Sequence, residues 1–143
     1  MNWNSIPNAE RLHLWKKLRQ DIKGRELKEQ LKMVATFFSE MPYSARTLDY
    51  YEPSTWPTPW EIIYNGAFCK SSISLLMFHT LLTSNIDTQL ILINDGADVY
   101  LLPLVDKTYV LNYQFNSINE MSDIADEIKV KQIIDNKQIK QIV

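Results

Sequence analysis

The residue with the clearest capacity for chemistry is Cys69, the only cysteine in this chain of 143 residues. It follows a segment stiffened by Pro57 and Pro59, and Gly66 gives the backbone freedom to turn just before it. The apolar run over 73–82 predicts a helix whose first turn holds Cys69. A thiol there meets the unsatisfied N–H groups and the positive end of the helix, which favour the nucleophilic thiolate. The pattern therefore indicates a candidate nucleophile.

Composition limits what kind of site can surround this thiol. The chain is 45% hydrophobic and 22% charged, as expected for one globular domain. Its net charge of −2 and lack of a basic stripe give no support to nucleic-acid binding. One cysteine cannot form an internal disulfide, and one cysteine with two histidines gives no plausible set of zinc ligands. Asp123, Asp126 and Glu127 are interpreted as a solvated helix face, so no metal site is expected.

Neither a signal peptide nor a membrane span is expected. The first residues, Met1–Ser5, lack the charged and apolar regions of a signal peptide. No uninterrupted apolar stretch is long enough to cross a bilayer. We therefore expect a cytoplasmic protein, or one built into an assembly inside a cell.

The elements that must position Cys69 begin with helices. Apolar residues at helical spacing predict two amphipathic helices within about 5–40, interrupted at Gly24 and ending before Pro42. The aromatic-rich stretch 41–59 predicts an irregular but ordered loop. The Cys69 helix is apolar almost all the way round, which predicts a buried central helix.

A β region follows the central helix. Residues 88–93 predict a strong strand, and 94–96 give a turn signal. Residues 99–102 predict a second strand, in which Pro103 favours an edge position or a bulge. Residues 109–113 predict a third strand.

The C-terminal part reads as an extension. Polar residues with caps at Ser117 and Ser122 precede a short helix expected near 124–128, and the alternating tail 129–142 predicts a hairpin. We expect a single domain over 1–143, made of a helical part at about 5–40, a core at about 41–115 and the extension at about 116–143.

Three motifs in this order resemble the bacterial transglutaminase-like cysteine proteinases. They are the aromatic helix end with Met-Pro-Tyr over 37–43, the Trp-Pro-Thr-Pro-Trp-Glu element over 56–61, and Gly66-Ala67-Phe68-Cys69. The likeness covers roughly 33–112. It implies an α+β, transglutaminase-like (papain-like) fold. In that fold, N-terminal helices accompany a central Cys-headed helix packed on an antiparallel sheet.

The same resemblance implies a triad that this chain keeps only in part. The family uses a cysteine thiolate, a histidine base on the next strand and an aspartate on the strand after it. Asp98 stands where the family has the histidine, and Asn112 stands where it has the aspartate. Phe68 replaces the aspartate that commonly precedes the cysteine. Only the nucleophile, Cys69, matches.

No other residue is a good substitute for the missing base. His79 lies ten residues beyond Cys69 on the same predicted helix, about 15 Å along its axis. His13 belongs to the N-terminal helices, and we interpret both histidines as packed or surface residues. Asp98 is a weak base at neutral pH, and its charge would oppose a nearby thiolate. Cys69 is then interpreted as a small buried apolar residue, with catalysis as the alternative.

Aromatic residues before Cys69 are candidates for binding. Trp56, Trp60 and Tyr64 could line a peptide groove beside the thiol, or pack against the N-terminal helices. Glu61 is expected to anchor the loop through backbone N–H groups.

These observations favour a transglutaminase-like domain that has lost catalysis and serves as a protein-binding or structural component, with a protein or peptide partner and no cofactor. Its Ile-, Asn- and Lys-rich composition is typical of AT-rich bacterial or phage genomes, so a viral assembly is the second expected location. One alternative is an active cysteine hydrolase or acyltransferase on peptide amides, with Cys69 as nucleophile. Another is a regulatory inhibitor of a protease.

Overall fold

The N-terminal part of the molecule is helical, as predicted. The computed structural model describes residues 3–39, 41–42, 48–66, 68–135 and 139. After a short 3₁₀ turn, η1 (Trp3–Ser5), two helices follow, α1 (Asn8–Asp21) and α2 (Leu27–Phe38). Gly24 separates them with a left-handed backbone (φ +75°) that favours glycine. The N-cap of α1 is Pro7, without a side-chain cap.

The loop that leads to the central helix contains structure that the sequence interpretation missed. It holds a 3₁₀ turn, η2 (Pro53–Thr55), and a helix, α3 (Pro59–Asn65). A capping box starts α3, because the Thr58 hydroxyl accepts from the Glu61 N–H at 3.3 Å and the Glu61 carboxylate accepts from the Thr58 N–H at 3.2 Å. The expected anchoring role of Glu61 is thereby confirmed. Motif residues Glu40, Tyr43 and Ala67 lie outside the described residues.

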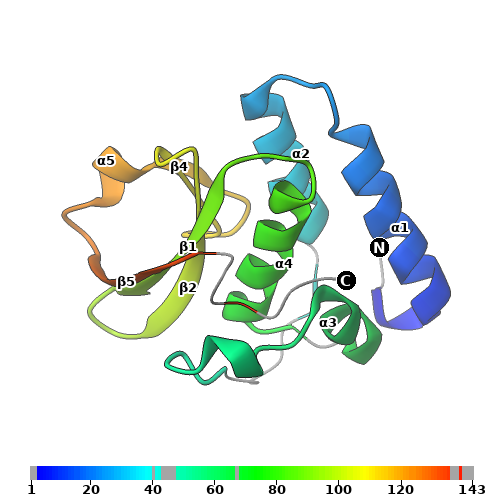
Figure 1. Ribbon diagram of the computed structural model, residues 1–143, viewed down its shortest axis with the longest axis horizontal. Coiled ribbons are helices and arrows are strands. Elements are labelled where there is room, and N and C mark those ends of the chain that lie inside the picture. Colours follow the sequence, from blue (N-terminus) through cyan, green and yellow to red (C-terminus); the bar gives the residue numbers. More distant parts are fainter. Residues whose placement is uncertain (1–2, 40, 43–47, 67, 136–138, 140–143) are drawn as a thin grey trace.

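The central helix α4 (Lys70–Leu82) is buried along almost its whole length, as predicted. It packs against the sheet through β1 and β2 and against α2 and α3 elsewhere on its surface. Figure 1 shows α4 in green between the sheet and the blue N-terminal helices. Helices α2 and α3 and strands β1 and β2 therefore all pack against α4.

One antiparallel sheet supplies the other half of the molecule. Its strands are β1 (Thr88–Asn94), β2 (Val99–Val105), β3 (Tyr109–Leu111), β4 (Ile118–Glu120) and β5 (Lys129–Ile134). Their order is β4-β3-β2-β1-β5, with every pairing antiparallel. Strand β2 is therefore interior and continues through Pro103, which pairs with Leu90 without a register shift. The expected edge or bulge at Pro103 is wrong. Pro103 is tolerated because the β2–β3 ladder covers only Leu104 and Val105.

The C-terminal segment also differs from the expectation. Its short helix α5 spans Met121–Ile124 rather than 124–128, and β4, missed by the sequence reading, precedes it. Strand β5 pairs with β1, so the first half of the expected hairpin belongs to the main sheet. The expected turn and second strand over 136–142 lie outside the described residues, except Ile139, which is buried.

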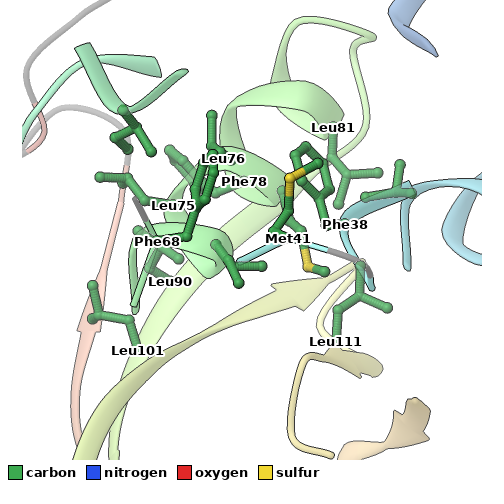
Figure 2. Packing of buried hydrophobic residues seen from close by; sticks show 14 of the residues in the cluster. Phe38, Met41, Phe68, Leu75, Leu76, Phe78, Leu81, Leu90, Leu101 and Leu111 are labelled. Carbon is green, nitrogen blue, oxygen red and sulfur yellow. The ribbon is translucent and has the colours of Figure 1, made fainter. Parts of the chain in front are cut away.

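Alternating residues of the strands build two apolar layers. Leu90, Leu101 and Leu111 belong to the main core with α4, and Figure 2 shows them with Leu75 and Leu76 of that helix. Ile91 and Leu102 belong to a second cluster that includes Ile124 of α5. Both faces of the sheet are thus covered, which explains why β1 is a continuous apolar run.

Candidate functional site

The approach to Cys69 is fixed by a tight backbone turn against an arginine. Gly66 ends α3 in a left-handed conformation (φ +66°). A Cβ at Gly66 would lie 2.7 Å from Nη1 of Arg11. That nitrogen donates to the carbonyl oxygens of Ile63 at 2.9 Å and Tyr64 at 3.3 Å. The guanidinium therefore supplies hydrogen-bond donors to carbonyl groups at the C-terminal end of α3. A side chain at position 66 would be strained by the positive φ and would have to displace the Arg11 guanidinium.

Cys69 is the N-cap of α4 and lies just outside its first turn. Its Sγ accepts a hydrogen bond from the N–H of Ser72 at 3.4 Å, while the Cys69 N–H donates to Oγ of Ser72 at 2.9 Å. The side chain has intermediate exposure, so the thiol is not the fully buried apolar residue that we expected. The preceding Phe68 is fully buried, and its N–H donates to the carbonyl oxygen of Pro42 at 3.3 Å. The thiol thus lies at the N-terminal end of a helix, as the sequence predicted.

Tyr50 is a neighbour of the thiol that sequence reasoning missed. Its hydroxyl lies 2.9 Å from Oγ of Ser71, which accepts from the N–H of Leu101 at 3.1 Å. Burial raises the pKa of Tyr50, and the charges of Cys69 and Asp98 raise it further, while the Ser71 hydrogen bond acts in the opposite direction. Tyr50 therefore lies within electrostatic range of both Cys69 and Asp98. No motif marked it, because it comes from an irregular loop.

Asp98 is exposed in the β1–β2 turn, one residue before β2 begins. The turn is organised by Asp95, whose carboxylate accepts from the N–H groups of Asp98 at 2.8 Å and Ala97 at 2.9 Å and from the Tyr100 hydroxyl at 2.9 Å. The hydrogen bonds from the Asp98 and Ala97 N–H groups, followed by that of Tyr100, lower the pKa of Asp95. The Asp98 backbone is held, while its side chain faces solvent.

Asn112 follows β3 in a left-handed conformation (φ +64°) and bonds to the central helix. Its Nδ2 donates to the carbonyl oxygen of Lys70 at 3.0 Å and to Oγ of Ser74 at 2.9 Å. The Ser74 hydroxyl in turn donates to the carbonyl oxygen of Leu101 at 2.7 Å. Asn112 thus connects α4 to the sheet through donated hydrogen bonds.

Lys70 adds a cation directly after the thiol. Its Nζ donates to the carbonyl oxygen of Tyr113 at 2.8 Å and lies 4.7 Å from the centre of the Tyr100 ring. Burial lowers the pKa of Lys70, and the nearby Asp95 carboxylate opposes this shift. The residue was missed because a lysine in a helix's first turn carries no distinctive pattern.

Neither histidine lies at this end of α4. His79 is in the last turn of α4 and is 4% exposed, and its burial lowers its pKa to about 4. His13 is exposed on α1. These are the two histidines of the chain, and both were correctly interpreted as packed or surface residues.

The three aromatic groove candidates lie in two different environments in the structure. Trp56 is 1% exposed, and its Nε1 donates to the carbonyl oxygen of Asp49 at 2.7 Å, so it is a core residue. Trp60 and Tyr64 are exposed on α3 and line an open pocket between α1 and α3. Cys69 does not line that pocket. Trp60 also packs edge to face on Trp15, with ring centres 5.0 Å apart.

Within the described part of the chain, no three or more His, Cys, Asp or Glu residues gather in a way that could hold a metal ion. Asp123, Asp126 and Glu127 are exposed, and Glu127 accepts a hydrogen bond from the Tyr113 hydroxyl at 2.9 Å. The described helices include none that is both long and apolar enough to cross a membrane.

Solved structures similar to this chain include those of LapG from Legionella pneumophila, a bacterial transglutaminase-like cysteine protease. One LapG structure matches with a TM-score of 0.75 and 16% identity over 90% of this chain and 76% of LapG. The calcium-bound LapG structure matches with a TM-score of 0.73 and 15% identity over 96% of this chain and 84% of LapG. The EGTA-treated structure matches with a TM-score of 0.73 and 17% identity over 90% of this chain and 74% of LapG. The fold is transglutaminase-like.

The comparison confirms the α+β, papain-like architecture that the three motifs implied. No protein-family model matches the sequence, and no curated protein sequence matches it significantly. In the transglutaminase-like fold described here, the thiol heads α4, Asp98 precedes β2 and Asn112 follows β3. At this level of identity, the likeness extends to the fold alone.

Proposed function

We propose that this transglutaminase-like domain has lost cysteine-protease catalysis and acts as a protein-binding or structural component. The observation that carries the proposal is the chemistry of Asn112. Its amide donates to Lys70 and Ser74 of α4, so it fills a structural role where the family resemblance implies an aspartate that orients a histidine. The resemblance puts Asp98 at the position of the family's histidine, and both histidines of the chain lie elsewhere in the sequence.

The substitution at Asp98 argues against amide hydrolysis on chemical grounds. An exposed carboxylate is a poor base at neutral pH, and its negative charge disfavours a thiolate close by. Imidazole can both remove the thiol proton and deliver it to the leaving amine, a sequence of steps that carboxylate at neutral pH does poorly. The thiol therefore lacks the partner that the reaction requires.

Exposed aromatic side chains near the same end of α4 support binding. Tyr51 is 71% exposed and follows Tyr50, whose hydroxyl contacts Ser71 of α4. Phe115 is 76% exposed in the loop after Asn112. Exposed aromatics are frequent anchors of protein interfaces. The proposal assigns partner binding to this end of α4.

Loss of catalysis is tested by comparing the wild-type protein with Cys69→Ala on a diverse library of peptide amides, with products identified by mass spectrometry. We expect no difference between the two. The double variant Asp98→His with Asn112→Asp restores the family residues and serves as the matched comparison. Cleavage by the wild-type protein that disappears in Cys69→Ala would overturn the proposal.

Binding is tested by isolating a complex from the source cells or virions, identifying the partner and titrating it against purified variants. Tyr51→Ser or Phe115→Ser should weaken binding about tenfold or more, whereas Cys69→Ser should leave it unchanged. Tyr64→Ser, at a similarly exposed tyrosine, is the control. Weakening by Trp60→Ser and Tyr64→Ser alone would instead favour the pocket between α1 and α3. A stoichiometric complex with a virion protein would support the assembly role.

One observation favours the enzymatic alternative. The Cys69 thiol is partly exposed and accepts a hydrogen bond from the Ser72 N–H. This setting is typical of a nucleophilic cysteine at the N-terminal end of a helix. Thiol-dependent cleavage or acyl transfer in the experiment above would establish this alternative.

A further inference from the structure

A small cavity lies beside the first turns of α4, on the side where α2 ends. Its apolar walls come from α2, from the chain just after it and from α4, and they include Ala35, Phe38, Met41, Ile73 and Met77. Its volume is about 140 Å³. A dry apolar cavity of about 150 Å³ in another protein accepts benzene, so this space has the size of one phenyl ring.

Three of the polar side chains at this cavity are already engaged in hydrogen bonds. The Lys70 ammonium donates to the carbonyl oxygen of Tyr113, a residue that does not line the cavity. The Asn112 amide donates to two groups of α4, and the Ser39 hydroxyl donates to the carbonyl oxygen of Thr36 at 2.7 Å. The cavity therefore favours an uncharged, apolar occupant.

A phenyl ring stands at the entrance of this cavity. Phe115 belongs to the lining, yet the residue is 76% exposed. Its ring thus leaves apolar area in water beside a space that lacks van der Waals partners, and moving the ring into that space would remove both deficits. The cavity has an occupant of matching size and chemistry within the same chain.

The backbone around Phe115 is held by hydrogen bonds on both sides. Before it, the carbonyl oxygen of Tyr113 accepts from Lys70. Around it, the Ser117 N–H donates to the carbonyl oxygen of Gln114 at 3.1 Å, and the Gln114 N–H donates to Oγ of Ser117 at 2.9 Å. Exposed side chains change rotamer readily, so rotation about χ1 is the simplest motion that carries the ring from solvent into the cavity.

We infer that Phe115 is a latch that exchanges between two positions, one with its ring in solvent and one with its ring in this cavity, against Phe38 and Met77. Burial of the ring favours the inward position, and the greater rotamer freedom of an exposed side chain favours the outward one. The exchange requires only the ring and the cavity, both of which belong to one chain.

The latch controls how much of the partner-binding end of α4 is available. The outward position presents an aromatic anchor, and the inward position withdraws it. A partner that binds the outward ring has its affinity reduced by the fraction of molecules in which the ring is outward. This regulatory consequence rests on the proposed function, whereas the exchange itself does not.

Fluorine NMR of protein labelled with 4-fluorophenylalanine tests the exchange without any partner. The label enters all five phenylalanines, and Phe115→Leu identifies the Phe115 signal. Ala35→Leu fills the cavity from α2 and should hold the ring outward, because Ala35 is buried and lines the cavity. Ala9→Leu, at an exposed alanine of α1, adds the same atoms away from the cavity and is the matched control.

The measured quantity is the broadening of the Phe115 signal by a soluble gadolinium chelate. Phe115 in the wild-type protein and in Ala9→Leu should be about twofold less accessible to the chelate than in Ala35→Leu. Equal accessibility in all three proteins would overturn the inference. Ala35→Val is the milder filling variant if Ala35→Leu does not fold, and the same comparison applies to it.

Dilution separates the latch from insertion of the ring into a second copy of the chain. The accessibility of Phe115 should stay constant on dilution, since ring and cavity belong to one molecule. A rise in accessibility on dilution would overturn the latch and show that the ring enters a neighbouring molecule.

The regulatory consequence is tested with the partner isolated for the proposed function. Ala35→Leu should tighten partner binding by the same factor, about twofold, by which it frees the ring, and Ala9→Leu should not change it. If Ala35→Leu raises the accessibility of Phe115 but leaves the affinity unchanged, the latch is supported and only the anchoring role of Phe115 in the proposed function fails.

Discussion

Asn112 and Lys70 are joined by a 3.0 Å hydrogen bond that ties the end of β3 to the first turn of α4. The donor is the Asn112 side chain and the acceptor is a backbone carbonyl, so the bond depends on an amide at position 112. This relationship leads to the first prediction.

Asn112→Asp should lower the free energy of unfolding by about 1–3 kcal/mol, because a carboxylate cannot donate to the Lys70 carbonyl oxygen. Urea unfolding followed by circular dichroism gives the value. Asn85→Asp is the matched control, since Asn85 is exposed and has the same left-handed backbone (φ +61°). It should cost less than about 0.5 kcal/mol. Equal losses in the two variants would contradict a specific role for the Asn112 amide.

Gly66→Ala should destabilise the protein more than Gly24→Ala. Both glycines have a left-handed backbone, which costs alanine about 1 kcal/mol. At Gly24 nothing lies within 4 Å of the added Cβ, whereas at Gly66 the Arg11 guanidinium is held 2.7 Å away by its own hydrogen bonds. We expect a difference of about 1–2 kcal/mol in urea unfolding, in the range of overpacking. A smaller loss at Gly66 would mean that Arg11 moves freely.

Stability should fall as the pH drops from about 6.5 towards 4, because of His79. Its pKa is about 4 in the folded state and 6.5 in an exposed histidine, so the unfolded chain binds more protons across this interval. Protonation therefore favours unfolding, at a cost on the order of 3 kcal/mol. His79→Leu removes this titrating group. The pH dependence of its unfolding free energy should be flatter than that of the wild-type protein, and an identical slope would refute the prediction.

Asp98→His should increase the reactivity of Cys69 towards iodoacetamide at pH 7 by about tenfold or more relative to Asp98→Asn. Both variants remove the carboxylate charge, but only histidine adds a base, and general bases contribute factors of about 10²–10⁴. The wild-type thiol should react no faster than free cysteine. The rate is measured by mass spectrometry of the intact protein. Equal rates in the two variants would place position 98 out of reach of the thiol.

The motifs allowed the architecture to be predicted because they lie where the fold has local constraints. Gly66 requires a left-handed turn, and Cys69 begins a helix that is apolar on every side, so both are visible in a short window of sequence. The Thr58–Glu61 capping box was visible too, but the surrounding prolines favoured a loop and α3 was missed. Pro103 was misjudged because a proline in an interior strand depends on how far the neighbouring ladder extends, which is a tertiary property.

The candidate site was predicted less completely than the fold. Asp98 and Asn112 were named from the motif pattern and stay predictions as site residues. Tyr50 and Lys70 were not named, since their hydrogen bonds join segments that are distant in the sequence. Trp56 illustrates the opposite error. An aromatic residue beside a nucleophile suggests a groove, yet Trp56 is buried in the main core, which is a tertiary property that a short window of sequence does not reveal.

The strand order has a consequence for how this site forms. Strand β1 lies between β2, which follows it directly, and β5, which comes from the end of the described chain, so Leu90 pairs with both Pro103 and Ile134. Pairings between distant segments form late and slow the folding of a domain. During synthesis, the sheet behind Cys69 stays one strand short until the segment that forms β5 has left the ribosome. Nascent chains of this protein therefore expose an open β1 edge, a surface on which chaperones or other strands can bind before the native β5 arrives.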